Sequence, residues 1–194
     1  MAYDVAIVGG GPAGASAATF TARAGLQTVL IDADAGMTRR AMVNNHLGFP
    51  DGVTGPELVD NGKAQAANAG AEVVAGKVTG LKPAGGEGGF VLSTEGGQTY
   101  EAEQVILTLG ANPELARQAG ITVRPGTEPH IKEVVQVDAD GRTSLPGVWA
   151  AGTTAGVSVH TIVTAGDGAR VAINLLSARK GERHVDHDVL PRPA

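Results

Sequence analysis

Three glycines near the start of the chain have the spacing of a phosphate-binding turn. Gly9, Gly11 and Gly14 form a Gly-x-Gly-x-x-Gly pattern directly after an apolar run. In such a pattern the first glycine permits a sharp turn, the second lets the backbone approach a pyrophosphate, and the third lets a helix pack closely on a strand. Asp32 ends the next apolar run, at the distance where a carboxylate accepts hydrogen bonds from an adenosine ribose. These residues predict a dinucleotide site; a glycine-rich structural turn beside a surface aspartate is the alternative.

The pattern lies inside a strand, helix and strand unit, which makes the prediction more specific. Residues 3–8 are β-rich and almost wholly apolar, as expected of a central parallel strand that is covered on both faces. An alanine-rich helix is expected through about Arg23, with Gly25 ending it before a second strand over residues 28–31. The free N–H groups and the positive dipole at the start of this helix would hold the phosphates. The unit by itself does not distinguish FAD from NAD.

The middle of the chain predicts one helix and several short strands. Residues 34–54 are rich in Gly, Asn and Pro and predict a long functional loop. A helix is expected from Gly55 to about Ala69, with Thr54 as its cap and Pro56 in its first turn. Glycine pairs then separate short β-rich runs, which predicts an antiparallel meander before a buried strand. The expected strands are residues 72–78, 90–94 and 99–101 in the meander and residues 104–109 in the buried strand.

The last part of the chain predicts a return to the sheet and a final helix. Residues 112–146 are expected to form a loop, a strand around residues 130–137 and a turn at Asp140 and Gly141. A buried strand over residues 147–151, a second glycine-rich turn and a helix over about residues 165–178 follow. The polar, proline-containing end is typical of a mobile tail. We therefore expect one domain over residues 1–181 and a C-terminal tail over residues 182–194.

Composition excludes several classes of function. The 194 residues include 29 glycines and 3% aromatic residues, which suits an α/β nucleotide binder of one domain. The net charge of −5, with scattered Lys and Arg, argues against a nucleic-acid partner. The chain has no cysteine, so it cannot itself carry a disulfide, a thiolate metal site or a thiol relay. No apolar run is long enough to span a bilayer, and no basic leader precedes the first strand, so we expect a cytoplasmic location and no membrane partner.

Two further segments carry a family resemblance. Residues 143–152, with the sequence TSLPGVWAAG, are similar to the segment that closes the FAD site in flavin-dependent pyridine nucleotide–disulphide oxidoreductases. Residues 43–50 and 54–58 resemble the loop that lies along the flavin in thioredoxin reductases. The resemblance covers almost the whole chain, in order. It implies an α/β, Rossmann-like FAD-binding fold of three layers: a central parallel sheet with helices on one side and an antiparallel β-meander on the other.

The resemblance also assigns cofactor contacts. In the family, the asparagine at the position of Asn45 bonds FAD, the backbone at the position of Val78 meets the adenine, and the turn matching residues 107–111 lies near the pyrophosphate. The implied FAD-binding residues come from both glycine turns, the ribose carboxylate and the loops beside the flavin. They are Gly9, Gly11, Pro12, Ala13, Gly14, Asp32, Ala33, Asn45, Val78, Thr108, Gly110, Gly152, Thr153, His160, Thr161 and Ile162.

The chain departs from the family in two places. A nicotinamide-binding domain with its own glycine fingerprint and a Cys-x-x-Cys pair is absent between Gly110 and the region of His130, and Thr153 stands where the family has an aspartate. These departures imply an FAD-dependent oxidoreductase that takes electrons from an external donor. The alternative is a non-catalytic FAD or NAD binding module or a partner subunit. Family members commonly pair through this domain, so a homodimer is also expected.

Several other polar residues have two interpretations each. His160 is the candidate for proton transfer, because imidazole titrates near neutral pH, or it only packs against the cofactor edge. His46 could contact the flavin or be solvated, and Arg39 and Arg40 could approach the pyrophosphate or face solvent. Residues 184–188 contain His and Asp in a metal-like cluster, but no scaffold fixes their geometry, so no metal site is predicted.

Overall fold

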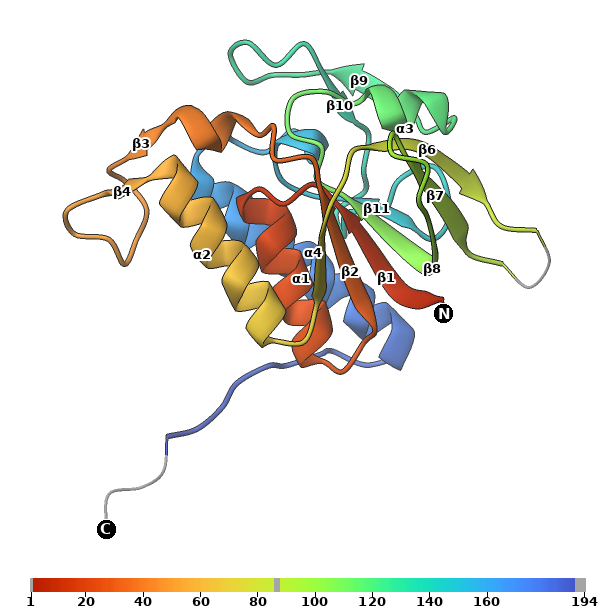
Figure 1. The fold of residues 1–194 in the computed structure, drawn as a ribbon, viewed down its shortest axis with the longest axis horizontal. Coiled ribbons are helices and arrows are strands. Elements are labelled where there is room, and N and C mark those ends of the chain that lie inside the picture. Colours follow the sequence, from red (N-terminus) through yellow and green to blue (C-terminus); the bar gives the residue numbers. More distant parts are fainter. Residues whose placement is uncertain (1, 86–87, 191–194) are drawn as a thin grey trace.

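The computed structural model describes residues 2–85 and 88–190 and contains one seven-stranded mixed sheet (Figure 1). Its hydrogen-bonded order is β5-β2-β1-β8-β7-β6, and β11 also pairs with β8. The parallel core consists of β5 (Glu72–Ala75), β2 (Thr28–Asp32), β1 (Tyr3–Val8), β8 (Thr99–Leu107) and β11 (Val148–Ala150). Strands β6 (Val78–Pro83) and β7 (Phe90–Thr94) continue from β8 as an antiparallel meander.

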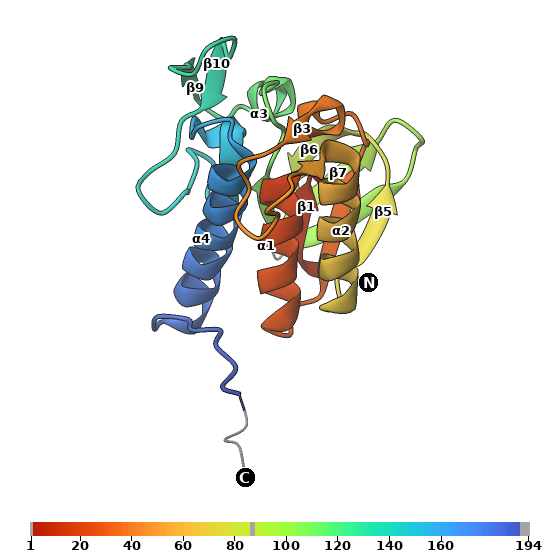
Figure 2. The ribbon, with the colours of Figure 1, turned by 90° about the vertical axis from the view of Figure 1, so that its left-hand side faces the viewer.

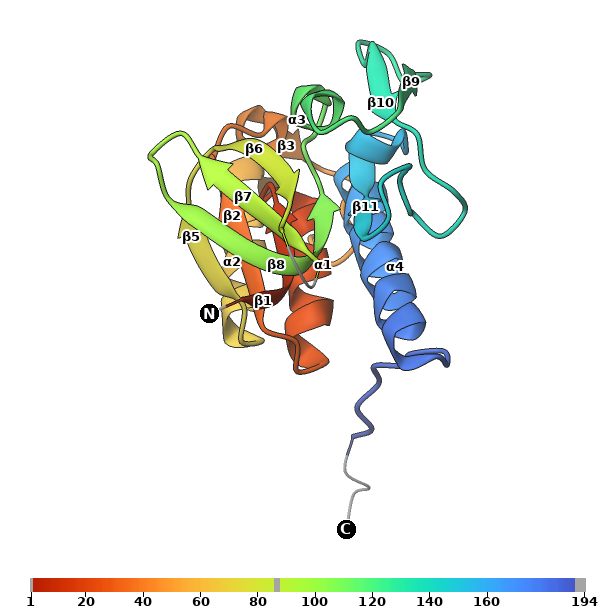
Figure 3. The ribbon, with the colours of Figure 1, turned by 90° about the vertical axis from the view of Figure 1, so that its right-hand side faces the viewer.

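Three long helices cover one face of the parallel core, and the meander lies on the other side of the molecule (Figures 2 and 3). These helices are α1 (Pro12–Arg23), α2 (Gly55–Asn68) and α4 (Thr161–Lys180). The smaller elements, which lie mainly beyond the carboxyl ends of the parallel strands, are η1 (Met37–Arg40), β3 (Met42–Val43), β4 (Val53–Thr54), α3 (Glu114–Gln118), β9 (Val123–Pro125), β10 (Glu133–Val135) and η2 (Gly152–Ala155). The architecture confirms the predicted fold class.

The central strand β1 is buried on both faces, as its continuous apolar run predicts. Val5 and Ile7 pack with the residues of α1 and α4 in one core cluster. Ala6 and Val8 belong to the other cluster, which includes Phe90 of the meander. Because side chains alternate across a strand, a sheet with two buried faces requires apolar residues at every position of its central strands.

The predicted first and second helices are confirmed. Helix α1 ends at Arg23, and Gly25 follows with a φ of 85°, the left-handed conformation that favours glycine after a helix. At the start of α2, the Thr54 hydroxyl accepts a hydrogen bond from the Glu57 N–H at 3.3 Å. Local capping signals were sufficient to locate these helices.

The predicted meander has the wrong strand boundaries. The strand expected over residues 72–78 is interrupted: β5 ends at Ala75, opposite Asp32 at the end of β2, and residues 76–77 lie outside any strand. Strand β6 then begins at Val78 and belongs to the meander. The two strands expected over residues 99–109 are one strand, β8, whose first half pairs with β7 and whose second half pairs with β11. The meander is therefore continuous with the parallel core.

Three expectations for the C-terminal half also need correction. The strand expected around residues 130–137 is limited to β10, because His130 lies in the turn before it with a φ of 65°. The short helix α3 lies within the region expected to be a loop. Helix α4 begins at Thr161, four residues before the expected start at residue 165, and ends at Lys180, where Gly181 follows in a left-handed conformation.

The segment after α4 is held against α1. Arg23 forms ion pairs with Asp186 and Asp188, each at 2.8 Å, so these two carboxylates contact the end of the first helix. The division into one domain and a tail stays a prediction. Within the described parts of the chain, no helix combines the length and the apolar character needed to cross a membrane.

Candidate functional site

Three loops meet at the carboxyl ends of β1, β8 and β11. The Thr108 hydroxyl, after β8, donates to the carbonyls of Val8 at 2.9 Å and Gly9 at 2.8 Å. The Thr154 hydroxyl, after β11, donates to the Gly110 carbonyl at 3.3 Å. The carboxyl ends of parallel strands are the usual place for ligands in open α/β sheets. The predicted glycine turns are therefore side by side, although they come from opposite ends of the chain.

The glycines of the first turn have different structural roles. A Cβ atom on Gly14 would lie 1.8 Å from the Gly9 carbonyl oxygen, and one on Gly9 would lie 2.3 Å from the Thr108 carbonyl oxygen. These two positions require glycine for packing. A Cβ atom on Gly11 would meet no protein atom within 4 Å, although Gly11 lines the cavity described below. Gly11 therefore leaves room for a ligand close to the start of α1.

The second glycine turn packs on the start of α1. A Cβ atom on Gly152 would lie 2.8 Å from the Ala13 Cβ, and one on Gly168 would lie 2.0 Å from the Ala13 carbonyl oxygen. The Asp167 carboxylate, buried on α4, accepts a hydrogen bond from the Gly152 N–H at 2.8 Å and pairs with Arg170 at 2.9 Å. Asp167 thus fixes the second turn relative to α4, and the sequence motifs do not identify it.

These turns border one large cavity of about 1030 Å³. This volume is at the upper end of the roughly 300–1,000 Å³ that is typical of small-molecule pockets. Most of the predicted site residues line it, namely Gly9, Gly11, Pro12, Ala13, Gly14, Asp32, Ala33, Val78, Thr108, Gly110, Thr153 and Thr161. Four predicted residues are not among those lining it: Asn45, Gly152, His160 and Ile162. The cavity therefore runs from the end of β2 to the start of α4.

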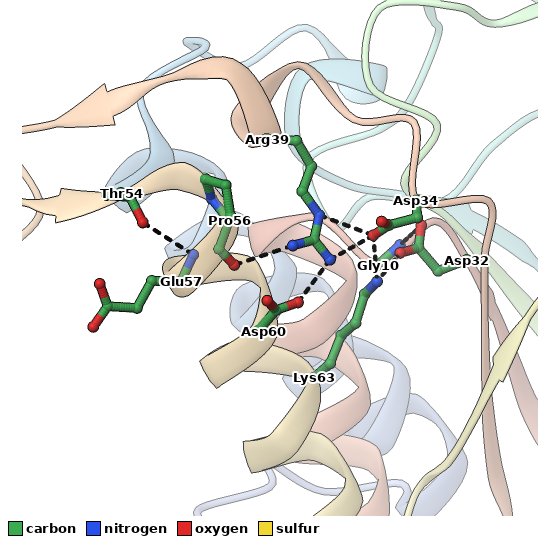
Figure 4. Close-up of polar contacts among 9 residues, drawn as sticks. All are labelled: Gly10, Asp32, Asp34, Arg39, Thr54, Pro56, Glu57, Asp60 and Lys63. Carbon is green, nitrogen blue, oxygen red and sulfur yellow. Dashed lines mark hydrogen bonds and ion pairs between the residues drawn. The ribbon is translucent and has the colours of Figure 1, made fainter.

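Asp32 lies at one end of the cavity and is already bound by two protein donors (Figure 4). The Gly10 N–H donates to one carboxylate oxygen at 2.9 Å, and the Lys63 ammonium of α2 pairs with the other. Lys63 also pairs with Asp34 at 2.9 Å. Burial, the largest single influence, lowers the pKa of Lys63, but the hydrogen bonds that its ammonium donates to the Asp32 and Asp34 carboxylates together outweigh burial, so the pKa is raised overall. Lys63 therefore stays charged at this end of the site.

Arg39 connects η1 to α2. Its guanidinium pairs with Asp34 at 2.5 Å and with Asp60 at 2.7 Å, and it donates to the Pro56 carbonyl at 3.2 Å (Figure 4). Hydrogen bonds from Lys63 and Arg39 lower the pKa of Asp34. The sequence suggested that Arg39 contacts a pyrophosphate or faces solvent. Instead, Arg39 links the loop after β2 to helix α2.

His46 contacts Thr161 at the start of α4. Its Nδ1 lies 3.0 Å from the Thr161 hydroxyl oxygen, and its ring meets the Phe49 ring edge-on at 5.8 Å between centroids. Burial lowers the pKa of His46, which favours the neutral imidazole. His46 therefore links the loop between β3 and β4 to a residue that lines the cavity.

The candidate proton donor, His160, has a different neighbourhood. Its Nδ1 lies 2.7 Å from the Ser158 hydroxyl oxygen. Glu128 accepts hydrogen bonds from the same hydroxyl at 3.2 Å and from the Val159 N–H at 3.3 Å. A proton-transfer role for His160 stays a prediction. His130, by contrast, lines the cavity with a left-handed backbone that is uncommon outside glycine, and the sequence gives no signal for this.

The described residues contain no group of three or more His, Cys, Asp or Glu side chains that could hold a metal ion. In the His and Asp cluster of residues 184–188, both aspartates pair with Arg23.

The residues around the cavity fit a dinucleotide with a pyrophosphate. Gly11 caps α1 without contributing a side chain, so a ligand can approach the N–H groups of the first helical turn. The first turn of α1 contains no acidic side chain that would repel phosphate. The Asp32 carboxylate supplies an acceptor for a ribose at one end, and the start of α4 supplies a positive helix end at the other. An extended nucleotide could span these two ends.

Comparisons with known proteins agree with this geometry. The family model described as "Pyridine nucleotide-disulphide oxidoreductase" matches residues 3–123 and 63–169. The chain is similar to the thioredoxin reductase of Streptomyces coelicolor, with 39% identity over 112 residues, which are 56% of this chain and 34% of that protein. The thioredoxin reductase of Listeria monocytogenes is 38% identical over 121 residues, 61% of this chain and 37% of that protein. The chain thus spans about a third of the length of these curated relatives.

The fold likeness to solved structures covers nearly the whole chain. The structure of a thioredoxin reductase from Gloeobacter violaceus matches with a TM-score of 0.79 at 19% identity, covering 97% of this chain and 99% of that chain. At this identity the match supports the fold alone.

Proposed function

The chain belongs to the pyridine nucleotide–disulphide oxidoreductase family, and from this premise we propose that it is an FAD-binding flavoprotein that exchanges electrons with a separate donor or acceptor. The observation that carries the proposal is the meeting of the two glycine turns around one cavity, where Gly152 packs against Ala13 at the start of α1. Such a cavity suits a nucleotide that extends from the ribose carboxylate to the start of α4.

Each end of the proposed site has its own role in binding. Gly11 and the first turn of α1 would hold the pyrophosphate, and Asp32 would accept hydrogen bonds from the adenosine ribose. Thr153, in place of the family aspartate, would offer a hydroxyl group to the ribityl chain. The positive end of α4 at Thr161 would stabilise negative charge at the flavin end. When bound, the flavin would supply the capacity to accept and release electrons.

The electron donor must come from outside this chain in the proposed function. The chain has no cysteine for a dithiol, and β8 is followed by the short helix α3 and the β9–β10 hairpin rather than by a second nucleotide domain. The structure of a ferredoxin–flavin thioredoxin reductase from Clostridium acetobutylicum has a related fold. It matches with a TM-score of 0.70 at 20% identity, covering 93% of this chain and 98% of that chain. Because that enzyme is named after ferredoxin, which is a redox protein, we propose to test redox proteins as the electron donor of this chain.

A variant whose cavity is blocked by an added side chain tests the proposal. The purified chain should bind FAD, show a flavin spectrum and lose and regain colour on reduction and reoxidation. Gly11→Val should abolish FAD binding without unfolding the protein, because Gly11 lines the cavity and a Cβ atom there would meet no protein atom within 4 Å. Gly166→Val, on the exposed face of α4, is the matched control and should bind FAD as the wild type does.

The outcomes separate the alternatives that the sequence left open. A wild-type protein that does not retain added FAD, or a Gly11→Val variant that binds it normally, contradicts the proposal. Retention of NAD instead identifies a different nucleotide. Tight FAD binding without electron exchange with NADH, NADPH, reduced thiols, ferredoxin or oxygen favours the non-catalytic binding module.

A further inference from the structure

The Lys63 ammonium group occupies an unusual place for a helix lysine, because it reaches the carboxylate at the ribose end of the cavity. It pairs with Asp32 and Asp34, and its side chain is only 18% exposed (Figure 4). The Asp32 side chain is 11% exposed. We propose that Lys63 is a positioning residue for the adenosine half of the nucleotide, which it supports by orienting Asp32. This inference rests on the proposed function.

The geometry of the Asp32 carboxylate supports this role. An ionised carboxylate has about four lone-pair sites. One oxygen accepts the Gly10 N–H, and the other pairs with Lys63. Each oxygen therefore keeps one acceptor site, and this arrangement matches a vicinal diol, which donates one hydrogen bond from each hydroxyl. The two protein donors also fix the plane of the carboxylate before a ligand arrives, which reduces the entropy lost on binding.

The neighbouring ion pairs explain why Lys63 can be removed selectively. Arg39 holds Asp34 and Asp60 independently of Lys63, so the loop after β2 stays attached to α2 in its absence. Asp32 would keep the Gly10 N–H but lose its charged partner. A substitution at Lys63 should therefore affect the ribose carboxylate more than the shape of the cavity.

The test uses ligands that do or do not contain adenosine. Lys63→Met keeps an unbranched side chain of similar helix propensity and removes the charge. We expect it to weaken the binding of FAD and of ADP by roughly tenfold each. Binding of FMN, which lacks the adenosine half, should be unchanged. Lys63→Arg should restore part of the affinity for FAD, and Lys82→Met, at an exposed position of β6, is the matched charge control.

A double-mutant cycle tests whether Lys63 acts through Asp32. In an Asp32→Asn background, Lys63→Met should change FAD affinity by less than about twofold, because the carboxylate it orients is gone. An equal loss of FMN and FAD affinity, or unchanged FAD and ADP affinity in Lys63→Met, overturns the inference and leaves the proposed function standing. A wild-type protein that binds no FAD overturns the proposed function, and the ADP titration then decides the role of Lys63 by itself.

Discussion

Asp167 shows how a single buried carboxylate can hold a turn that no motif assigns to it. Its oxygens accept the Gly152 N–H at 2.8 Å and pair with Arg170 at 2.9 Å. Thr153 follows Gly152 in this chain, and the Asp167 carboxylate contacts the second glycine turn from α4. Because a buried acceptor to a backbone N–H is costly to remove, this residue should matter for both stability and the shape of the cavity.

Asp167→Ala should lower the free energy of unfolding by about 2 kcal/mol, because it leaves the buried Gly152 N–H without its charged acceptor. Asp167→Asn keeps an acceptor of the same shape and should lose less. Urea denaturation of the ligand-free proteins measures both changes. Equal stability of all three proteins would show that the Gly152 N–H finds another partner.

His46 should make stability depend on pH. Burial lowers the pKa of its imidazole in the folded state, so folding favours the neutral form. Its stabilising contribution is complete above the unfolded pKa of about 6.5 and is lost as pH falls through the lower folded pKa. Below about pH 6.5 the unfolded chain binds the additional proton, and stability therefore falls with decreasing pH.

The measurement is the free energy of unfolding of the wild type and of His46→Gln between pH 5 and pH 8. We expect the difference between the two proteins to shrink or change sign as pH falls, because the glutamine does not titrate. A difference that is constant over this range contradicts a pKa shift at His46.

At the scale of elements, the crossing of α1 and α4 depends on one glycine. A Cβ atom on Gly168 would lie 2.0 Å from the Ala13 carbonyl oxygen, whereas one on Gly166 would meet nothing within 4 Å. Both residues are inside the same helix, two positions apart. Substitution of each glycine by alanine therefore adds the same methyl group, but only the methyl group at position 168 meets the backbone of α1.

Gly168→Ala should destabilise the protein by about 1–3 kcal/mol, since the helices must move apart to admit the methyl group. Gly166→Ala should stabilise it by roughly 0.5–1 kcal/mol, because alanine has the higher helix propensity. Thermal denaturation of the two variants gives the comparison directly. A Gly168→Ala variant as stable as Gly166→Ala would mean that the two helices do not pack as closely as the structure indicates.

Elements defined by local signals could be predicted from the sequence. Helix α2 has a capping Thr54 and an early Pro56, so its start is encoded by neighbouring residues. The boundary between β5 and β6 was missed because it depends on which strand each segment pairs with. A short apolar run does not specify its partner strand, and here β5 pairs with β2 whereas β6 pairs with β7.

The same distinction applies to the site. The glycine turns were predictable because close packing restricts Gly9, Gly14 and Gly152 to glycine. Lys63, Asp167 and His130 were not predictable, because each lies outside the glycine motifs, on another helix or turn, and only the folded chain brings it to the cavity or to a residue that borders it. Asn45 and His160, to which the resemblance assigned cofactor contacts, are not among the residues that line the cavity, and their contacts with the cofactor stay predictions.

At the scale of the whole molecule, the cavity joins the two ends of the chain. Its residues run from Val8 at the end of β1 to Thr164 in α4, and the first and last long helices, α1 and α4, pack together. A ligand that spans the cavity contacts the first strand, helix and strand unit as well as the C-terminal helix. Unfolding separates these two parts of the chain. Ligand binding should therefore raise the free energy of unfolding of the whole molecule.

FAD should raise the thermal stability of the whole chain. At a free concentration 100 times its Kd, a ligand that binds only the folded state adds about 2.7 kcal/mol to the free energy of unfolding. For a protein of this size that corresponds to an increase in Tm of roughly 5–10 °C. In the proposed function, FMN would contact only the flavin end, and the lower affinity expected for it should give a smaller shift at the same concentration. Scanning calorimetry with FAD, FMN and no ligand measures this, and Gly11→Val, at a position that lines the cavity, should show no shift with FAD. If FAD and FMN raise Tm equally at equal concentration, the adenosine half contributes nothing to binding, and the first turn is only a structural feature of the fold.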